Sequence, residues 1–187
     1  AEPKDTKEIH EIVGPINAWE RQYSDLDPAD GADVVEIRLV SNRLCRLNGF
    51  RDQHGREHWD RVHDWSEAFL RRNMGYRFVR AGELADGRAL QAGATPLVLD
   101  GVAAVSDAEH AALVAYLENG GVAWLRLPYG TLNERGFPRR VSVAEKLATR
   151  QFPGLVMLPD VPPEQALEER IAAGGLAPRI TSAPPGR

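Results

Sequence analysis

The sequence predicts an α/β protein in which helices cover a mostly parallel sheet. Residues 95–99 form a short β-rich run, and Ser106 with Glu109 is a capping box that predicts a helix start. Apolar residues then recur at helical spacing until the Asn-Gly-Gly of residues 119–121, which predicts a left-handed C-cap. Residues 122–127 are again typical of a strand. A strand, a crossover helix and a second strand make a right-handed βαβ unit, and such units build parallel sheets.

Further elements of the same kind are expected along the chain. Strands are predicted at residues 34–40, 76–79 and 155–158, helices at 58–73, 143–149 and 163–173, a helical turn at 85–92 and a polar loop at 41–56. In the first strand Glu36 and Arg38 alternate with apolar residues, which predicts one wet face or an edge position. The buried stripe expected for helix 58–73 consists of Trp59, Val62, Phe69 and Leu70.

Length and composition favour one soluble domain of ordinary size. The chain has 187 residues, of which 43% are hydrophobic, and this is enough for one core. Its net charge of −4 comes from 27 acidic and 23 basic residues that are mixed along the chain, so no nucleic-acid partner is expected. No apolar run approaches the roughly 20 residues that cross a bilayer, so no membrane partner is expected either. The single cysteine excludes an internal disulfide and leaves the compartment open between cytoplasm and exterior.

Both ends look like connectors to other parts of a longer protein. Residues 1–28 are expected to form a leading helix or connector, because apolar residues between positions 9 and 23 alternate by three and four. That stripe must be buried on the chain's own core or on a neighbour. Residues 179–187 are expected to be a linker or the start of a further domain, which leaves 29–178 as the main domain. The start at Ala1 fits either an excised domain or a mature exported protein.

Three stretches of the chain, taken in order, resemble a known family. They are DVVEIRLVSNR at residues 33–43, HWDRVHDWSEAFLRRNMGYRFV at 58–79 and TPLVLDGVAAVSDAEHAALVAYLENGGVAWLRLP at 95–128. Together they look like the class I glutamine-amidotransferase-like domain of family 42 β-galactosidases and related glycoside hydrolases, commonly called the trimerisation domain. The similarity covers roughly residues 15–178, and its motifs describe fold rather than chemistry.

This resemblance implies a flavodoxin-like three-layer sandwich that performs no chemistry of its own. In those enzymes the catalytic carboxylates lie in a separate barrel domain, and EIHEIVGPINAWERQ at residues 8–22 resembles the helix that leads from the barrel into this domain. The resemblance therefore implies that the partners are the chain's own catalytic barrel or further copies in a homo-oligomer, with carbohydrate as a further candidate.

Patterns typical of catalysis are absent from the sequence. An amidotransferase needs a nucleophilic cysteine on a glycine-flanked turn between strand and helix, whereas Cys45 has Leu44 and Arg46 beside it. We interpret Cys45 as a structural or merely exposed thiol. No G-x-S-x-G, Walker or Rossmann glycine pattern occurs. No catalytic residue is therefore assigned, and no cofactor is expected.

Metal and glycosidase sites receive little support from spacing. His54, His58 and His63 are four and five residues apart and do not converge on one helix face, so no metal site is predicted. A carboxylate pair of the glycosidase type would have to come from acids near predicted strand ends, and surface acids are the simpler interpretation. These acids are Glu36, Asp100 and Glu134.

Ligands of open α/β sheets bind beyond the carboxyl ends of the strands. In this sequence the side chains expected there are Asn42 and Arg43 after the first strand, Asp100 after the third, and Tyr129 after the fourth. An arginine, an amide and an aromatic ring suit a sugar or a neighbouring protein. These four residues are the candidates for binding a ligand or a partner.

Two functions from different classes are compatible with these observations. The first is a non-catalytic assembly or interaction domain of a carbohydrate-active enzyme of the β-galactosidase type. The alternative is a free-standing hydrolase or amidotransferase-like enzyme whose site follows no familiar pattern. The absent nucleophile turn favours the first.

Overall fold

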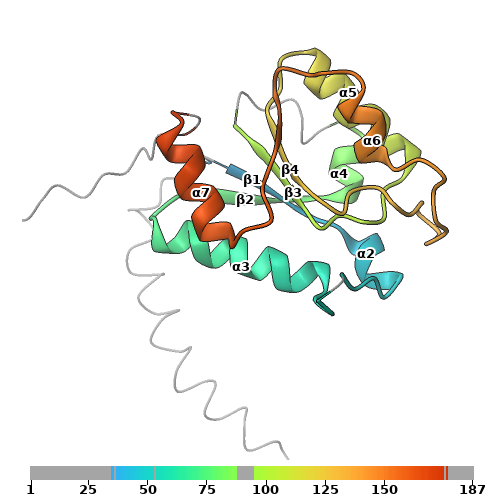
Figure 1. Cartoon of the computed structure of the whole chain (residues 1–187), viewed down its shortest axis with the longest axis horizontal. Coiled ribbons are helices and arrows are strands. Elements are labelled where there is room, and N and C mark those ends of the chain that lie inside the picture. The colour runs from blue at the N-terminus through green and yellow to red at the C-terminus, as the bar shows by residue number, and fades with distance from the viewer. Residues whose placement is uncertain (1–34, 36, 53, 88–94, 175, 177–187) are drawn as a thin grey trace, which may run out of the picture. The chain divides into compact units, whose positions relative to one another are not determined.

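A five-stranded sheet forms the centre of the protein (Figure 1). The computed structural model describes residues 35, 37–52, 54–87, 95–174 and 176, all within the compact unit Val34–Arg187. The strands are β1 (Ile37–Ser41), β2 (Tyr76–Arg80), β3 (Leu97–Asp100), β4 (Ala123–Arg126) and β5 (Leu155–Met157). They lie in the order β2-β1-β3-β4-β5, and every neighbouring pair is parallel. The connectors predicted at 1–28 and 179–187 lie outside the described residues.

Helices cover both faces of this sheet (Figure 1). They are α2 (Arg43–Leu47), α3 (His58–Arg71), α4 (Ala81–Ala85), α5 (Asp107–Glu118), α6 (Val143–Ala148) and α7 (Pro163–Ala172). Helices α3 and α7 pack on one face, and α4, α5 and α6 pack on the other. The predicted three-layer, flavodoxin-like sandwich is confirmed. Within the described part of the chain, no helix combines the length and apolar character needed to cross a bilayer.

The central strands β3 and β4 are mostly apolar on both faces because both faces are covered. In β3, Leu97 and Leu99 point into the core beneath α4, α5 and α6, while Val98 points into the core beneath α3 and α7. In β4, Leu125 points into the first of these cores and Trp124 into the second. With this two-residue alternation, successive residues of a strand fill the two cores in turn.

Strand β1 corrects the prediction of an edge position or a wet face. It lies between β2 and β3, and Arg38 is only 2% exposed. The guanidinium of Arg38 donates hydrogen bonds to the Thr95 carbonyl and, at 2.6 Å, to the Tyr116 hydroxyl, and it also stacks on the Tyr116 ring. These contacts compensate for burial of the charge, which is how a charged residue occurs in an inner strand. Glu36 lies outside the described residues.

Helix α3 corrects the predicted buried stripe. Val62 and Phe69 are buried as expected, but Trp59 and Leu70 are exposed. The buried face instead follows the spacing His58, Arg61, Val62, Trp65, Ala68 and Phe69. The spacing of apolar residues does not reveal this face, because His58 and Arg61 are polar and the core accepts them only through hydrogen bonds to distant residues.

Local capping explains most other boundaries. The predicted capping box of α5 is confirmed, since Ser106 Oγ accepts a hydrogen bond from the Glu109 N–H and Glu109 accepts one from the Ser106 N–H. The predicted C-cap is confirmed by the positive φ of Gly120. The loop predicted at 41–56 contains α2, and α4 comes earlier than the turn predicted at 85–92, of which residues 88–92 are outside the described part.

Candidate functional site

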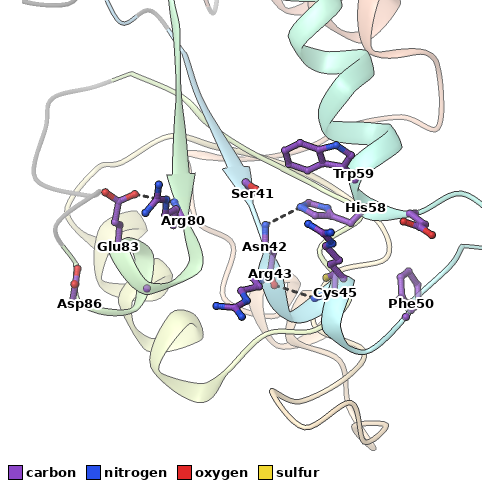
Figure 2. Close-up of a pocket in the computed structure, with 14 residues that line it drawn as sticks. Ser41, Asn42, Arg43, Cys45, Phe50, His58, Trp59, Arg80, Glu83 and Asp86 are labelled. Carbon is purple, nitrogen blue, oxygen red and sulfur yellow. Dashed lines mark hydrogen bonds between the residues drawn. The ribbon is translucent and has the colours of Figure 1, made fainter. Parts of the chain in front are cut away.

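A cavity of about 720 Å³ lies beyond the carboxyl ends of β1 and β2 (Figure 2). Three segments supply its walls: residues 41–50, from the end of β1 through α2; residues 57–59, at the start of α3; and residues 80–86, from the end of β2 through α4. Its lining consists of Ser41, Asn42, Arg43, Cys45, Arg46, Gly49, Phe50, Glu57, His58, Trp59, Arg80, Gly82, Glu83 and Asp86. The volume falls within the roughly 300–1,000 Å³ typical of small-molecule sites.

Asn42 organises the turn on which this cavity depends. Its side-chain oxygen accepts hydrogen bonds from the backbone N–H groups of Leu44 and Cys45, and so caps α2. Its amide nitrogen donates to the Ala104 carbonyl at 3.0 Å and to Glu109 at 3.1 Å. The side chain is 2% exposed, so its polar atoms hold the fold together and leave Arg43, the next residue, exposed at the cavity.

His58 joins the ends of β1 and β3 to the first turn of α3. Its Nε2 accepts a hydrogen bond from the Asn42 backbone N–H at 2.9 Å, and its Nδ1 lies 3.1 Å from the Asp100 carbonyl oxygen. The first bond requires a bare Nε2, so Nδ1 carries the proton and donates it to the carbonyl. Burial lowers the pKa of His58, which keeps the ring neutral. The imidazole is therefore a bridge between strand ends.

Asp100 lies at the centre of a buried ion network. Its carboxylate accepts hydrogen bonds from Arg61 at 2.6 Å and from the Trp65 indole at 2.7 Å, and it pairs with Arg126 at 3.0 Å. Arg61 also pairs with Asp52 at 2.6 Å. Each member is deeply buried, so the four charges compensate one another in a low-dielectric environment.

This network fills the place where a fold of this type usually binds its ligand. The strand order reverses between β1 and β3, and ligands bind at such switch points. Here Arg61 crosses that point and packs on Gly101, which has a φ of +63°. A Cβ at Gly101 would lie 2.6 Å from the Arg61 Cδ, so glycine is required for this approach. The open cavity is consequently displaced toward β2.

Tyr129 and Cys45 lie in the core. Tyr129 is fully buried, and burial raises its pKa far above the ordinary value. The Cys45 Sγ accepts a hydrogen bond from the Ala104 N–H at 3.3 Å, and burial raises the pKa of the thiol to about 11. The thiol is thus protonated at neutral pH, whereas a nucleophilic cysteine must ionise. These observations agree with the interpretation of Cys45 as structural.

The four predicted binding residues therefore separate into two groups. Asn42 and Arg43 line the cavity, whereas Asp100 and Tyr129 do not contribute to its walls. Of the acids considered for a glycosidase pair, Asp100 is tied into the ion network and Glu134 is exposed on the loop after β4, while Glu36 lies outside the described part. Among the described residues, no group of three or more His, Cys, Asp or Glu side chains is arranged to hold a metal ion.

Sequence reasoning missed Trp59, Arg80 and Glu83 as cavity residues. Helical spacing predicts that Trp59 lies in the core, but it is 55% exposed and lines the cavity. Arg80 and Glu83 follow β2, and applying the strand-end rule to that strand as well would have found them.

A second hollow, of about 510 Å³, lies beyond the ends of β4 and β5. We call it the apolar groove. Leu127 and Met157 line it and are 56% and 47% exposed. Phe137 and Val141, on the loop between β4 and α6, add further exposed apolar surface. Arg140 and Glu145 line the same groove and give it charges of both signs.

Comparison with known proteins identifies similar folds. No family model matches the sequence, and no curated protein matches it. The solved structure of an apo exo-carrageenase GH42 from Bacteroides ovatus is similar at a TM-score of 0.52 and 12% identity, over 76% of this chain and 18% of that one. The chain has the fold of a part of this enzyme.

Two β-galactosidases are also similar, at lower TM-scores. The one from the psychrophilic Marinomonas ef1 has a TM-score of 0.49 and 12% identity, over 81% of this chain and 22% of that one. The one from Bifidobacterium adolescentis has a TM-score of 0.44 and 16% identity, over 74% of this chain and 53% of that one. This chain therefore spans between about a fifth and a half of these proteins. The resemblance noted in the sequence is confirmed at the level of the fold.

Proposed function

We propose that this chain is a non-catalytic assembly domain of a carbohydrate-active enzyme of the β-galactosidase type. The observation that carries the proposal is that the side chains able to take part in catalysis are already occupied by structural contacts. Cys45 is a buried thiol with a raised pKa, Asp100 neutralises two arginines, and His58 has both ring nitrogens engaged. The fold shared with 18% of an exo-carrageenase chain supports a role inside a larger hydrolase.

The apolar groove is the surface that we assign to assembly, with a second copy of this chain as its partner. Exposed Leu127, Met157, Phe137 and Val141 gather around the ends of β4 and β5, and apolar patches of this kind mark interaction sites. A two-fold interface needs a self-complementary surface. Arg140 and Glu145 meet that requirement because they carry opposite charges. Arg140 of one copy can face Glu145 of the second copy, and the reverse.

Light scattering over a range of concentrations tests this assignment. We expect the mass of the wild-type chain to rise with concentration, and Leu127→Glu to weaken the association by about tenfold or more because a charge is then buried at the interface. Leu70→Glu is the matched control, since Leu70 is a leucine of similar exposure on α3. A monomeric wild-type chain up to millimolar concentration, or equal effects of the two variants, would contradict the assignment.

The non-catalytic part has a separate test. The chain should not hydrolyse glutamine, because the thiol of Cys45 is buried and protonated. It should not cleave aryl glycosides either, because Asp100, one of the acids considered for a carboxylate pair, is held by Arg61 and Arg126. Measurable turnover that disappears in Cys45→Ala would establish the alternative, an amidotransferase-like enzyme.

A further inference from the structure

The charges that line the cavity at the ends of β1 and β2 are not equally engaged. On the acidic side, Glu57 pairs with Arg51 and Glu83 accepts the Arg80 backbone N–H at 2.9 Å. On the basic side, Arg43 and Arg46 are exposed residues that line the cavity. Within the described residues, no carboxylate lies within ion-pair distance of either guanidinium.

Arg80 adds a third guanidinium from the opposite wall. It is exposed, and within the described residues it has no carboxylate at ion-pair distance. Figure 2 shows Arg80 and Glu83 on one side of the cavity and Arg43 on the other. His58 is neutral, so Arg43, Arg46 and Arg80 are the cations of the cavity. Three carboxylates, Glu57, Glu83 and Asp86, line it as well, so an anionic ligand has to be held beside the arginines. Guanidinium groups bind carboxylates and sulfates through paired, charge-assisted hydrogen bonds.

Trp59 supplies an apolar surface beside these cations. Tryptophan is usually well buried, but Trp59 is 55% exposed. It lies in the first turn of α3 and lines the cavity (Figure 2). Phe50, which is partly buried, lines the cavity as well. A large aromatic face in a concave, polar site packs against the C–H face of a ring while the polar groups fix its orientation.

We propose that this cavity binds an acidic sugar, a mono- or disaccharide that carries a carboxylate or a sulfate. The anionic group lies between Arg43 and Arg80, and the sugar ring packs on Trp59. Carboxylate and sulfate each present two oxygens that can accept paired hydrogen bonds from a guanidinium, and the cavity volume suits a ligand of this size. The proposal does not depend on assembly, because the apolar groove lies at other strands and shares no lining residue with this cavity.

Isothermal titration calorimetry with three sugars that differ only at C6 tests the proposal. Galacturonate, galactose 6-sulfate and neutral galactose are titrated into the whole chain, with inorganic sulfate as a fourth ligand. At least one acidic sugar should bind about tenfold or more tightly than galactose and than inorganic sulfate, and its affinity should fall as salt is added. Which acidic sugar binds more tightly identifies the anionic group. No binding of either acidic sugar at millimolar concentration, or equal binding of galactose, would overturn the proposal.

Variants decide whether the binding occurs in this cavity. Arg43→Gln and Trp59→Ala should each lower the affinity for the acidic sugar by about tenfold. Arg77→Gln is the matched control, because Arg77 is an exposed arginine of β2 that does not line the cavity. Both test positions are exposed, so unchanged circular dichroism and unfolding midpoints are expected. If Arg43→Gln and Arg77→Gln reduce affinity equally, binding is non-specific attraction to surface charge, and the proposal is wrong.

Discussion

The ends of β1 and β2 and the ends of β4 and β5 belong to the same edge of one sheet but have opposite chemistry. The first carries a cavity lined by three arginines and an exposed tryptophan, and the second carries a groove with exposed Leu127 and Met157. The ends of β3 lie between them, where Asp100, Arg61 and Arg126 close the surface. The ion network at the end of β3 therefore separates two surfaces at this edge of the sheet.

The largest effect on stability is expected from breaking the ion network around Asp100. Asp100→Ala leaves Arg61 and Arg126 buried without their shared partner, and should lower the free energy of unfolding by about 3–5 kcal/mol in urea titrations. Glu118→Ala breaks an ion pair that is half exposed and should change stability by at most about 1 kcal/mol. Similar losses in the two variants would mean that the network does not hold the strand ends together.

A smaller effect should appear in acid. Burial alone would raise the pKa of Asp52, but hydrogen bonds from Arg61 and from the N–H groups of His54 and Arg56 outweigh it and lower the pKa to about 2. Because the folded pKa is below the unfolded one, Asp52 contributes full stability above about pH 4 and loses it as the pH falls towards 2.

Urea midpoints measured between pH 6 and pH 2 check this contribution. Between pH 6 and pH 2 the free energy of unfolding of the wild type should fall by at most about 2 kcal/mol more than that of Asp52→Asn, since the variant has no titrating group at this position. Parallel pH profiles for the two proteins would show that Asp52 is not engaged by Arg61 in solution.

The smallest effect is expected from a helix cap outside both surfaces. Ser106→Ala removes the hydroxyl that accepts the Glu109 N–H at 3.1 Å, and should destabilise the domain by about 1 kcal/mol. Thermal or urea unfolding measures this change. Self-association and sugar binding should be unchanged, and a loss of either without a loss of stability would assign Ser106 a functional role.

Local signals in the sequence were sufficient for the fold. The capping box at Ser106, the glycine at position 120 and the short apolar runs each depend on neighbours within a few residues, and the structure confirms them. Each describes a backbone preference that local chemistry decides. The order of these elements was then enough to predict a parallel sheet between helices.

The two surfaces were harder to predict because distant residues define them. Asp100 was correctly placed at a strand end, but its neutralisation by Arg61 joins residues 39 positions apart, and no local pattern reveals it. Trp59 has the spacing of a core residue, and only the position of α3 beside the turn after β1 makes it a cavity residue. Helical periodicity treats every apolar residue alike, so it could not separate Trp59 from Trp65.

Sedimentation velocity of Arg43→Gln and Leu127→Glu, run beside the wild type at several concentrations, tests most directly the claim that assembly resides at the ends of β4 and β5. We predict that Leu127→Glu sediments as a monomer where the wild type associates, and that Arg43→Gln associates like the wild type, because Arg43 lies in the other surface. Association that Arg43→Gln abolishes and Leu127→Glu leaves intact would contradict the account.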